Sequence, residues 1–178
     1  IRMINQLLDW LRLESDQMAL TPTAIDTRRW MADLASAFLN EFPDIGTPVE
    51  WADRFRVNVQ LQPPQIVTDT LRLKQSLHYI MEYLLLAGSE PQGIEVSVWG
   101  AWIGLTLWNQ AQPVALPLLM RGLGLHTLPQ RGESEHNLLD TLGMVLACRL
   151  IDLQGGEITY LASSRFGNRI TLLLPRDL

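Results

Sequence analysis

The residue types that most often carry chemistry are few in this chain of 178 residues. It has three histidines, His78, His126 and His136, and one cysteine, Cys148. None of the histidines forms a cluster with acidic residues at metal-ligand spacing, and no Ser-His-Asp set has the order and context of a nucleophilic triad. The lone cysteine excludes an internal disulfide and a multi-cysteine metal site. We therefore expect His78 on the surface and Cys148 in the core.

The overall composition is that of a globular domain with a substantial core. Hydrophobic residues make up 47% and charged residues 19%, which excludes disorder as the main description. The net charge of -5 argues against nonspecific binding to nucleic acid or anionic lipid, so no nucleic acid partner is expected. No apolar run approaches the ~20 residues that a membrane span requires. We expect a reducing, cytoplasmic compartment. Since the chain begins with Ile1 rather than Met, it could also be the cytoplasmic part of a larger, membrane-bound protein.

Hydrophobic periodicity of three to four residues predicts four helices. They are expected over residues 1–15, 27–42, 69–87 and 138–154. In the first helix an apolar seam repeats at spacings of three, four and three residues, and it consists of Ile1, Ile4, Leu8 and Leu11. Such a seam is typical of a helix that dimerises, and the alternative is a helix docked on its own domain.

Alternation with a period of two residues predicts strands that are partly segregated from the helices. They are expected over residues 57–61, 66–67, 94–98, 103–107, 157–161 and 170–174. Gly100 separates two of them and indicates a tight hairpin, where Trp99 and Trp102 are either packed or form an exposed patch for a partner. The long segment 110–137, with its prolines and glycines, is typical of a functional or mobile loop. This order predicts an α+β fold with helices layered on one face of a mixed sheet.

Four motifs, in order along the chain, resemble those of sensor histidine kinases. Residues 4–15 (INQLLDWLRLES) resemble the end of their dimerisation hairpin, and residues 69–77 (DTLRLKQSL) resemble the opening of their N-box helix. Residues 150–158 (LIDLQGGEI) are similar to the turn after their glycine box, and residues 163–175 (SSRFGNRITLLLP) to their final hairpin. The resemblance implies a two-layer α/β sandwich of the type shared by histidine kinases, gyrase and heat-shock chaperone ATPases. It implies two parts, a dimerisation helix over residues 1–20 and an ATPase-like domain over residues 21–178.

The same resemblance implies where a nucleotide would bind. In that family, asparagines of the N-box helix help to hold Mg²⁺ on ATP, an aspartate after a strand binds adenine, and glycines approach the phosphates. Here the two asparagine positions fall on Tyr79 and Tyr83, the aspartate position falls on Asn109, and Gly143 is the one glycine-box residue kept. A phenol is a poor Mg²⁺ ligand, whereas Asn109 can still accept a hydrogen bond. The four positions therefore predict a mostly degenerate cofactor-binding site, with no catalytic residue and no metal ligand.

A second glycine pattern, Gly122-Leu123-Gly124-Leu125, has the letters of the glycine box at a different place. Pro129 follows within a few residues, whereas the family's glycines lead straight into the helix that ends at Gly155-Gly156. We interpret this pattern as a turn in the lid region rather than as a nucleotide-binding loop.

Three functions are consistent with these residues. The first is a pseudokinase that needs no cofactor, forms a homodimer through the N-terminal helix and docks a response-regulator receiver domain or another kinase. The second is an active histidine kinase that uses ATP and Mg²⁺ with Asn109 at adenine and Gly143 at the phosphates. The third is a phosphotransfer protein that passes phosphate from His to Asp without ATP. A phospho-accepting histidine of the family's type would precede Ile1, since none of the three histidines has its sequence context.

Overall fold

The computed structural model describes residues 2–15, 18–41, 56–59, 65–86, 93–110 and 135–176. The elements follow one another in the order α1 (Arg2–Glu14), β1 (Thr23–Asp26), α2 (Thr27–Glu41), β2 (Arg56–Val59), β3 (Gln65–Thr68), α4 (Thr70–Leu86), β4 (Gly93–Trp99), β5 (Trp102–Asn109), α5 (Glu135–Asp152), β6 (Glu157–Ser163) and β7 (Gly167–Pro175). None of the helices in these ranges is long and apolar enough to cross a membrane.

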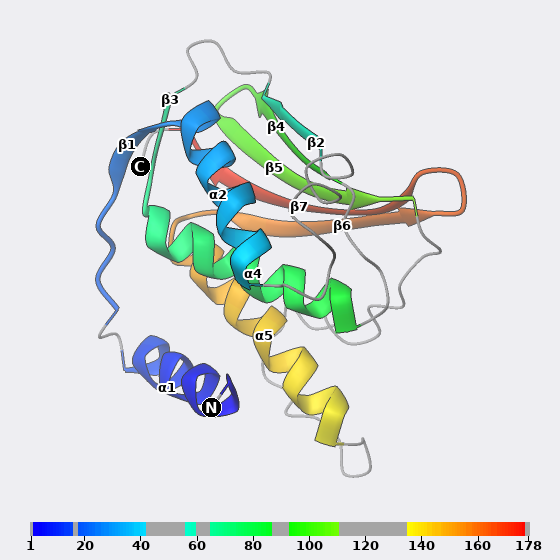
Figure 1. Ribbon diagram of the computed structural model, residues 1–178. Coiled ribbons are helices and arrows are strands. Elements are labelled where there is room, and N and C mark those ends of the chain that lie inside the picture. Colours follow the sequence, from blue (N-terminus) through cyan, green and yellow to red (C-terminus); the bar gives the residue numbers. More distant parts are fainter. Residues whose placement is uncertain are drawn as a thin grey trace.

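The main layer is a mixed five-stranded sheet in the order β2-β4-β5-β7-β6. Its β2 and β4 strands pair in parallel, and the other neighbours pair antiparallel. Strands β1 and β3 form a separate antiparallel pair. Figure 1 shows α4 and α5 below this sheet, with α1 farther from it. The expected α+β fold, with helices layered on a mixed sheet, is confirmed.

The core lies between the sheet and helices α4 and α5. On α4, apolar side chains recur at helical spacing and are fully buried: Leu73, Leu77, Ile80 and Met81. On the sheet, alternate residues of β4 and β5 face them: Ile94, Val96, Ile103, Leu105 and Leu107. Each such side chain contributes about 1.5–3 kcal/mol when it leaves water. This burial explains why the two periodicities in the sequence lead to one helix-on-sheet sandwich.

Two aspartates begin the helices that follow strands. The Asp26 carboxylate accepts a hydrogen bond from the Arg29 N–H at 3.0 Å, and the Asp69 carboxylate accepts one from the Arg72 N–H at 3.0 Å. Each satisfies a backbone donor that a helix start leaves without an intrahelical partner. Gly100 has a φ of 62° in the β4–β5 hairpin, as the sequence indicates.

The structure differs from the expected elements at two places. Strand β1 is not foreseen, because it is short and mostly exposed and so lacks an alternating apolar pattern. Helix α5 begins at Glu135 rather than at Leu138, so it includes the end of the segment expected to be a loop. Residues 111–134 of that segment, with His126 and the Gly122-Leu123-Gly124-Leu125 pattern, lie outside the described residues.

Candidate functional site

Tyr79, at the first of the expected asparagine positions, lies under helix α1. Its side chain is 6% exposed, and its hydroxyl donates a hydrogen bond to the Asp9 carboxylate at 2.8 Å. The Gln75 amide donates to the same carboxylate oxygen at 2.5 Å and to the Tyr79 hydroxyl at 3.3 Å. Burial, and then the hydrogen bond to Asp9, raises the pKa of Tyr79 well above its ordinary value. The phenol is therefore held neutral as a donor to α1.

Gly143, the remaining glycine-box residue, lies on α5 next to Tyr79 and α1. A Cβ built at Gly143 would lie 3.4 Å from the Gln6 amide nitrogen and 3.7 Å from the Tyr79 ring. Gln6 is 2% exposed, and neither atom of its amide has a hydrogen-bond partner within the described ranges. Such a buried, unpaired amide costs about 1–3 kcal/mol. The structure therefore brings Tyr79 and Gly143 together and adds Gln6, which the sequence reasoning does not single out.

Asn109 ends strand β5 in a hydrogen-bonded cluster built by neighbouring strands. Its buried carbonyl oxygen accepts a hydrogen bond from the Asn168 amide at 2.9 Å. The Asn168 carbonyl oxygen in turn accepts a hydrogen bond from the Tyr160 hydroxyl at 2.6 Å. Gly167, with a φ of 68°, lets the chain pass close to Asn109, because a Cβ there would lie 1.9 Å from the Asn109 backbone oxygen. Tyr83, one turn beyond Tyr79 on α4, is half-buried against the core.

Helix α1 has two faces with different surroundings. Its apolar seam is largely in solvent, with Ile4 59% and Leu11 62% exposed and Leu8 also exposed. The opposite face is docked, since Trp10 packs against the core and Asp9 bonds α4. The helix thus packs on its own domain and still exposes the apolar seam to solvent. Ile1, the first residue of the seam, lies outside the described residues. Gln6 and Asp9 are three residues apart and lie opposite the seam. Polar residues at this spacing share one helix face, and this is the sequence signal that indicates the docked face.

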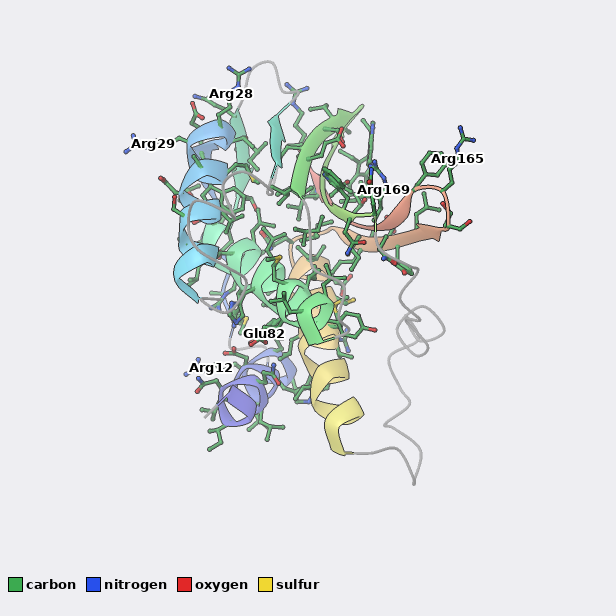
Figure 2. All side chains as sticks on the ribbon, turned by 45° about the vertical axis from the view of Figure 1, so that its right-hand side comes forward. Arg12, Arg28, Arg29, Glu82, Arg165 and Arg169 are labelled. Atoms are coloured by element: carbon green, nitrogen blue, oxygen red, sulfur yellow. The ribbon has the colours of Figure 1, made fainter. Side chains whose placement is uncertain are left out.

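A groove of about 650 Å³ lies between α1 and α4. Its walls include Gln6, Asp9 and Arg12 from α1 and Arg72, Gln75 and Tyr79 from α4. Figure 2 shows Arg12 of α1 and Glu82 of α4 on the same side of the molecule, away from Arg165 and Arg169 of the β6–β7 hairpin. The volume falls within the usual range of small-molecule sites.

The remaining candidate residues are a histidine, the cysteine and two tryptophans, and none of them lies in the groove between α1 and α4 except His78. His78 is partly exposed and lies 3.5 Å from the Glu82 carboxylate. Cys148 is buried as expected, and burial, with the nearby charge of Asp152, raises the pKa of its thiol to about 11. Trp99 and Trp102 are exposed at the β4–β5 hairpin. Across the described part of the chain, no group of three or more His, Cys, Asp or Glu is placed to hold a metal ion.

Comparison with known proteins finds similarity in structure only. No protein-family model matches the sequence, and no curated protein does. The Acinetobacter baumannii histidine kinase AdeS superposes with a TM-score of 0.65 at 14% identity, over 98% of this chain and 77% of AdeS. Full-length ShkA, solved in complex with AMPPNP, superposes with a TM-score of 0.71 at 17% identity, over 97% of this chain and 35% of ShkA.

A third similar protein is the histidine kinase ThkA. Its catalytic domain superposes with a TM-score of 0.64 at 14% identity, over 89% of this chain and 99% of that domain. ThkA in complex with the response regulator protein TrrA superposes with a TM-score of 0.62 at 15% identity, over 97% of this chain and 49% of ThkA. The sandwich expected from the sequence motifs is thus confirmed, and this chain has the fold of a histidine kinase catalytic domain.

Proposed function

We propose that this chain is a two-component signalling module that has kept the kinase fold and no longer uses ATP. In this proposal it dimerises through α1 and docks a response-regulator receiver domain or a partner kinase in the cytoplasm. Residues 1–20 serve dimerisation, and residues 21–178 form the ATPase-like domain. The observation that carries the proposal is the environment of Tyr79, a buried phenol bonded to α1 where a kinase of this fold would hold Mg²⁺.

The residues at the four expected nucleotide positions do not fit Mg-ATP. The Tyr79 hydroxyl donates to Asp9, whereas Mg²⁺ needs compact oxygen donors and several retained waters. Gly143 is covered by the Gln6 amide and the Tyr79 ring, which leaves little room for a phosphate to approach the backbone. The Asn109 carbonyl oxygen already accepts a hydrogen bond from Asn168. Together these contacts favour the pseudokinase over an active kinase.

Nucleotide titration tests this part of the proposal. We expect millimolar Mg-ATP to leave the melting temperature of the chain unchanged, because only a ligand that binds the folded state stabilises it. ShkA with AMPPNP, a complex that forms, is the positive control under the same conditions. A rise of several degrees with Mg-ATP, absent with Mg²⁺ alone, would show that the site still binds nucleotide and would refute the pseudokinase proposal.

The exposed seam of α1 supports homodimerisation. Ile4, Leu8 and Leu11 are apolar and exposed on one face, while the opposite face is docked on the domain. A second copy would remove this seam from water in a coiled-coil-like contact. We expect Leu8→Glu to shift sedimentation equilibrium toward monomer, and Leu161→Glu, a change of another exposed leucine, on β6, to leave it unchanged. A monomeric parent chain at all accessible concentrations would contradict dimerisation.

Docking of a receiver domain is supported by the ThkA structure, which contains the response regulator protein TrrA. The corresponding experiment is titration of receiver domains from the same genome into the labelled chain. Saturable binding by one receiver domain, with no binding by the others, is expected. Uniformly weak binding by all of them would leave a partner kinase as the remaining candidate of this proposal.

A further inference from the structure

The β4–β5 hairpin carries two tryptophans on one face of the main sheet. Trp99 and Trp102 are directly opposite each other in the strand ladder, so their side chains leave the same face. Ile103 and Leu105, which alternate with them, are buried toward α4 and α5, and Figure 1 shows these helices on one side of the sheet. The tryptophans therefore lie on the outer face, where Trp99 is 53% and Trp102 42% exposed.

Gly104 lets the Trp99 ring lie close to the sheet. A Cβ built at Gly104 would come within 2.8 Å and 3.1 Å of two atoms of the six-membered ring of Trp99, so the ring occupies the space that a side chain would take there. The other side of the ring faces solvent and is open to stacking. On β7, Leu173 is directly opposite Gly104, and Pro175 is directly opposite Trp102. We call the apolar surface made by Trp99, Trp102, Leu173 and Pro175 the tryptophan ledge.

The area of the tryptophan ledge sets the size of its partner. An aromatic side chain buries at most about 250 Å², so at their exposures the two indoles together offer roughly 200–250 Å². Each partner in a stable complex of two folded proteins buries about 800 Å². The ledge is therefore too small to hold a second copy of this chain or another folded domain by itself, and it fits a short peptide.

The chemistry of the tryptophan ledge favours proline. A polyproline II helix is preformed and has no internal hydrogen bonds, and proteins recognise it with aromatic rings against which its prolines pack. The indole N–H is a donor that can bond one of the free carbonyls of such a helix. A sugar, which also stacks on indoles, needs several polar side chains for its hydroxyls. The neighbouring positions on β5 and β7 are instead Gly104, Leu173 and Pro175.

A carboxylate lies at one end of the same row of residues. Glu157 of β6 is directly opposite Leu173, which is directly opposite Gly104, so the three positions form one row across the outer face. The Glu157 side chain is exposed. The charged residues that face the same way on β4 and β7 are Glu95 and Arg169, and they pair with each other at 3.8 Å. Glu157 therefore favours a peptide with a basic residue.

The spacing of the strands matches the repeat of a polyproline II helix. The Trp99 ring lies over β5, and β6 is two strands farther along the sheet, or about 9.6 Å. A polyproline II helix has three residues per turn and rises 3.1 Å per residue, so its residues i and i+3 share one side and are about 9.3 Å apart. A proline stacked on Trp99 thus brings the residue three positions away to Glu157.

We propose that the tryptophan ledge and Glu157 bind a proline-rich segment of a partner protein. The segment crosses β5, β7 and β6 as a polyproline II helix. One proline stacks on Trp99, and a lysine or arginine three positions away pairs with Glu157. This inference does not rest on the proposed function, because Tyr79 and Gly143 belong to helices on the other side of the sheet.

Titration with the synthetic peptide PPPPPRPPP tests the proposal, with NMR and fluorescence anisotropy as readouts. We expect the indole N–H signals of Trp99 and Trp102 to move and to saturate below about 1 mM peptide. The signals of Trp10 and Trp30, which pack against the core, should stay in place. PPPPPAPPP, which lacks the charge, should bind about tenfold more weakly, and AAAAARAAA, which lacks the prolines, should not bind. Cellopentaose, a probe for sugar stacking, should not bind either.

Three variants locate the peptide on the sheet. Glu157→Gln should weaken binding of PPPPPRPPP to the level of PPPPPAPPP and leave PPPPPAPPP unaffected. Gly104→Ala, whose methyl group would displace the Trp99 ring, should weaken both proline peptides about tenfold. Leu161→Ala changes an exposed leucine farther along β6 on the same face and should leave binding unchanged.

The proposal is overturned if neither indole signal moves with PPPPPRPPP, if PPPPPRPPP and PPPPPAPPP bind alike, or if cellopentaose binds and the peptides do not. None of these results changes the outcome of the Mg-ATP titration or of sedimentation, which concern other parts of the molecule. Failure of this proposal is therefore distinguishable from failure of the proposed function.

Discussion

The two polar clusters of this molecule are built in different ways. Around Asn109, the partners come from adjacent strands, and the chain of hydrogen bonds from Tyr160 to Asn168 to Asn109 is continuous. Around Tyr79, the hydrogen-bond partners come from helices α1 and α4, with α5 packed beside them at Gly143, and the neighbouring Gln6 amide has no partner among the described residues. The polar groups named in the Asn109 cluster are hydrogen-bonded to one another, whereas the Tyr79 cluster includes an amide that is unpaired within the described ranges.

The difference follows from what positions each cluster. Asn109 and Asn168 are directly opposite in the β5–β7 ladder, so backbone hydrogen bonds set the distance between their side chains. Helices α1, α4 and α5 have no shared backbone ladder, and side-chain packing alone sets their separation. We infer that the strand cluster is fixed more firmly than the helix cluster. Substitutions in both clusters test this inference.

The largest effect is expected at Gly167, which allows the close approach of β7 to Asn109. In Gly167→Ala the new Cβ would meet the Asn109 backbone oxygen at 1.9 Å, with φ in the left-handed region. We expect a loss of about 4 kcal/mol in the free energy of unfolding, measured with urea. Gly100→Ala is the control, because its φ is also positive but nothing lies within 4 Å, so it should cost about 1 kcal/mol. Equal losses would show that the strand cluster is not tightly packed.

The next effect is expected from breaking the strand cluster itself. Asn168→Ala removes the amide that donates to Asn109 and the carbonyl that accepts from Tyr160. We expect urea unfolding to show a loss of about 2 kcal/mol. Tyr160→Phe, which removes one hydrogen bond only, should cost about 1 kcal/mol. A loss below that of Tyr160→Phe would argue against a structural role for Asn168.

A smaller and pH-dependent effect is expected at Tyr79. Tyr79→Phe removes the hydrogen bond to Asp9 and should cost about 1 kcal/mol at neutral pH. Folding raises the Tyr79 pKa above its ordinary value of 10.0. The neutral phenol therefore contributes its full share to the free energy of unfolding below pH 10.0, and this share is lost as the pH rises further. Chemical unfolding from pH 8 upward should therefore show a steeper decline for the parent chain than for Tyr79→Phe. Parallel curves would mean that Tyr79 is not held under α1 in solution.

The smallest effect is expected at Gln6 and has the opposite sign. Gln6→Leu replaces a buried, unpaired amide by an apolar group of similar size. We expect it to stabilise the unliganded chain by about 0.5–1 kcal/mol in urea unfolding. A loss of more than about 1 kcal/mol would mean that the amide has partners in solution and that the two clusters do not differ as inferred.

The element pattern could be predicted well from the sequence, for a local reason. The apolar pattern indicates which side chains are buried. It alternates in residues 94–98 and 103–107, and it has helical spacing around Leu73 and Leu77. Strand β1 cannot be predicted in this way, because it is mostly exposed where it pairs with β3 and so has no alternating apolar pattern. The resemblance to kinases placed Tyr79 and Gly143 in one site, but it gave no hint of Asp9 or Gln6 beside them.

The sequence itself determined the features that depend on residues close together in the chain. These are the order of the elements, the hairpin at Gly100, the helix caps at Asp26 and Asp69, and the buried face of α4. The docking of α1 was decided by the tertiary structure alone. Asp9 and Tyr79 are 70 residues apart, and their contact depends on how side chains of separate helices pack. The groove between α1 and α4 exists for the same reason, since packing there leaves space that no local pattern encodes.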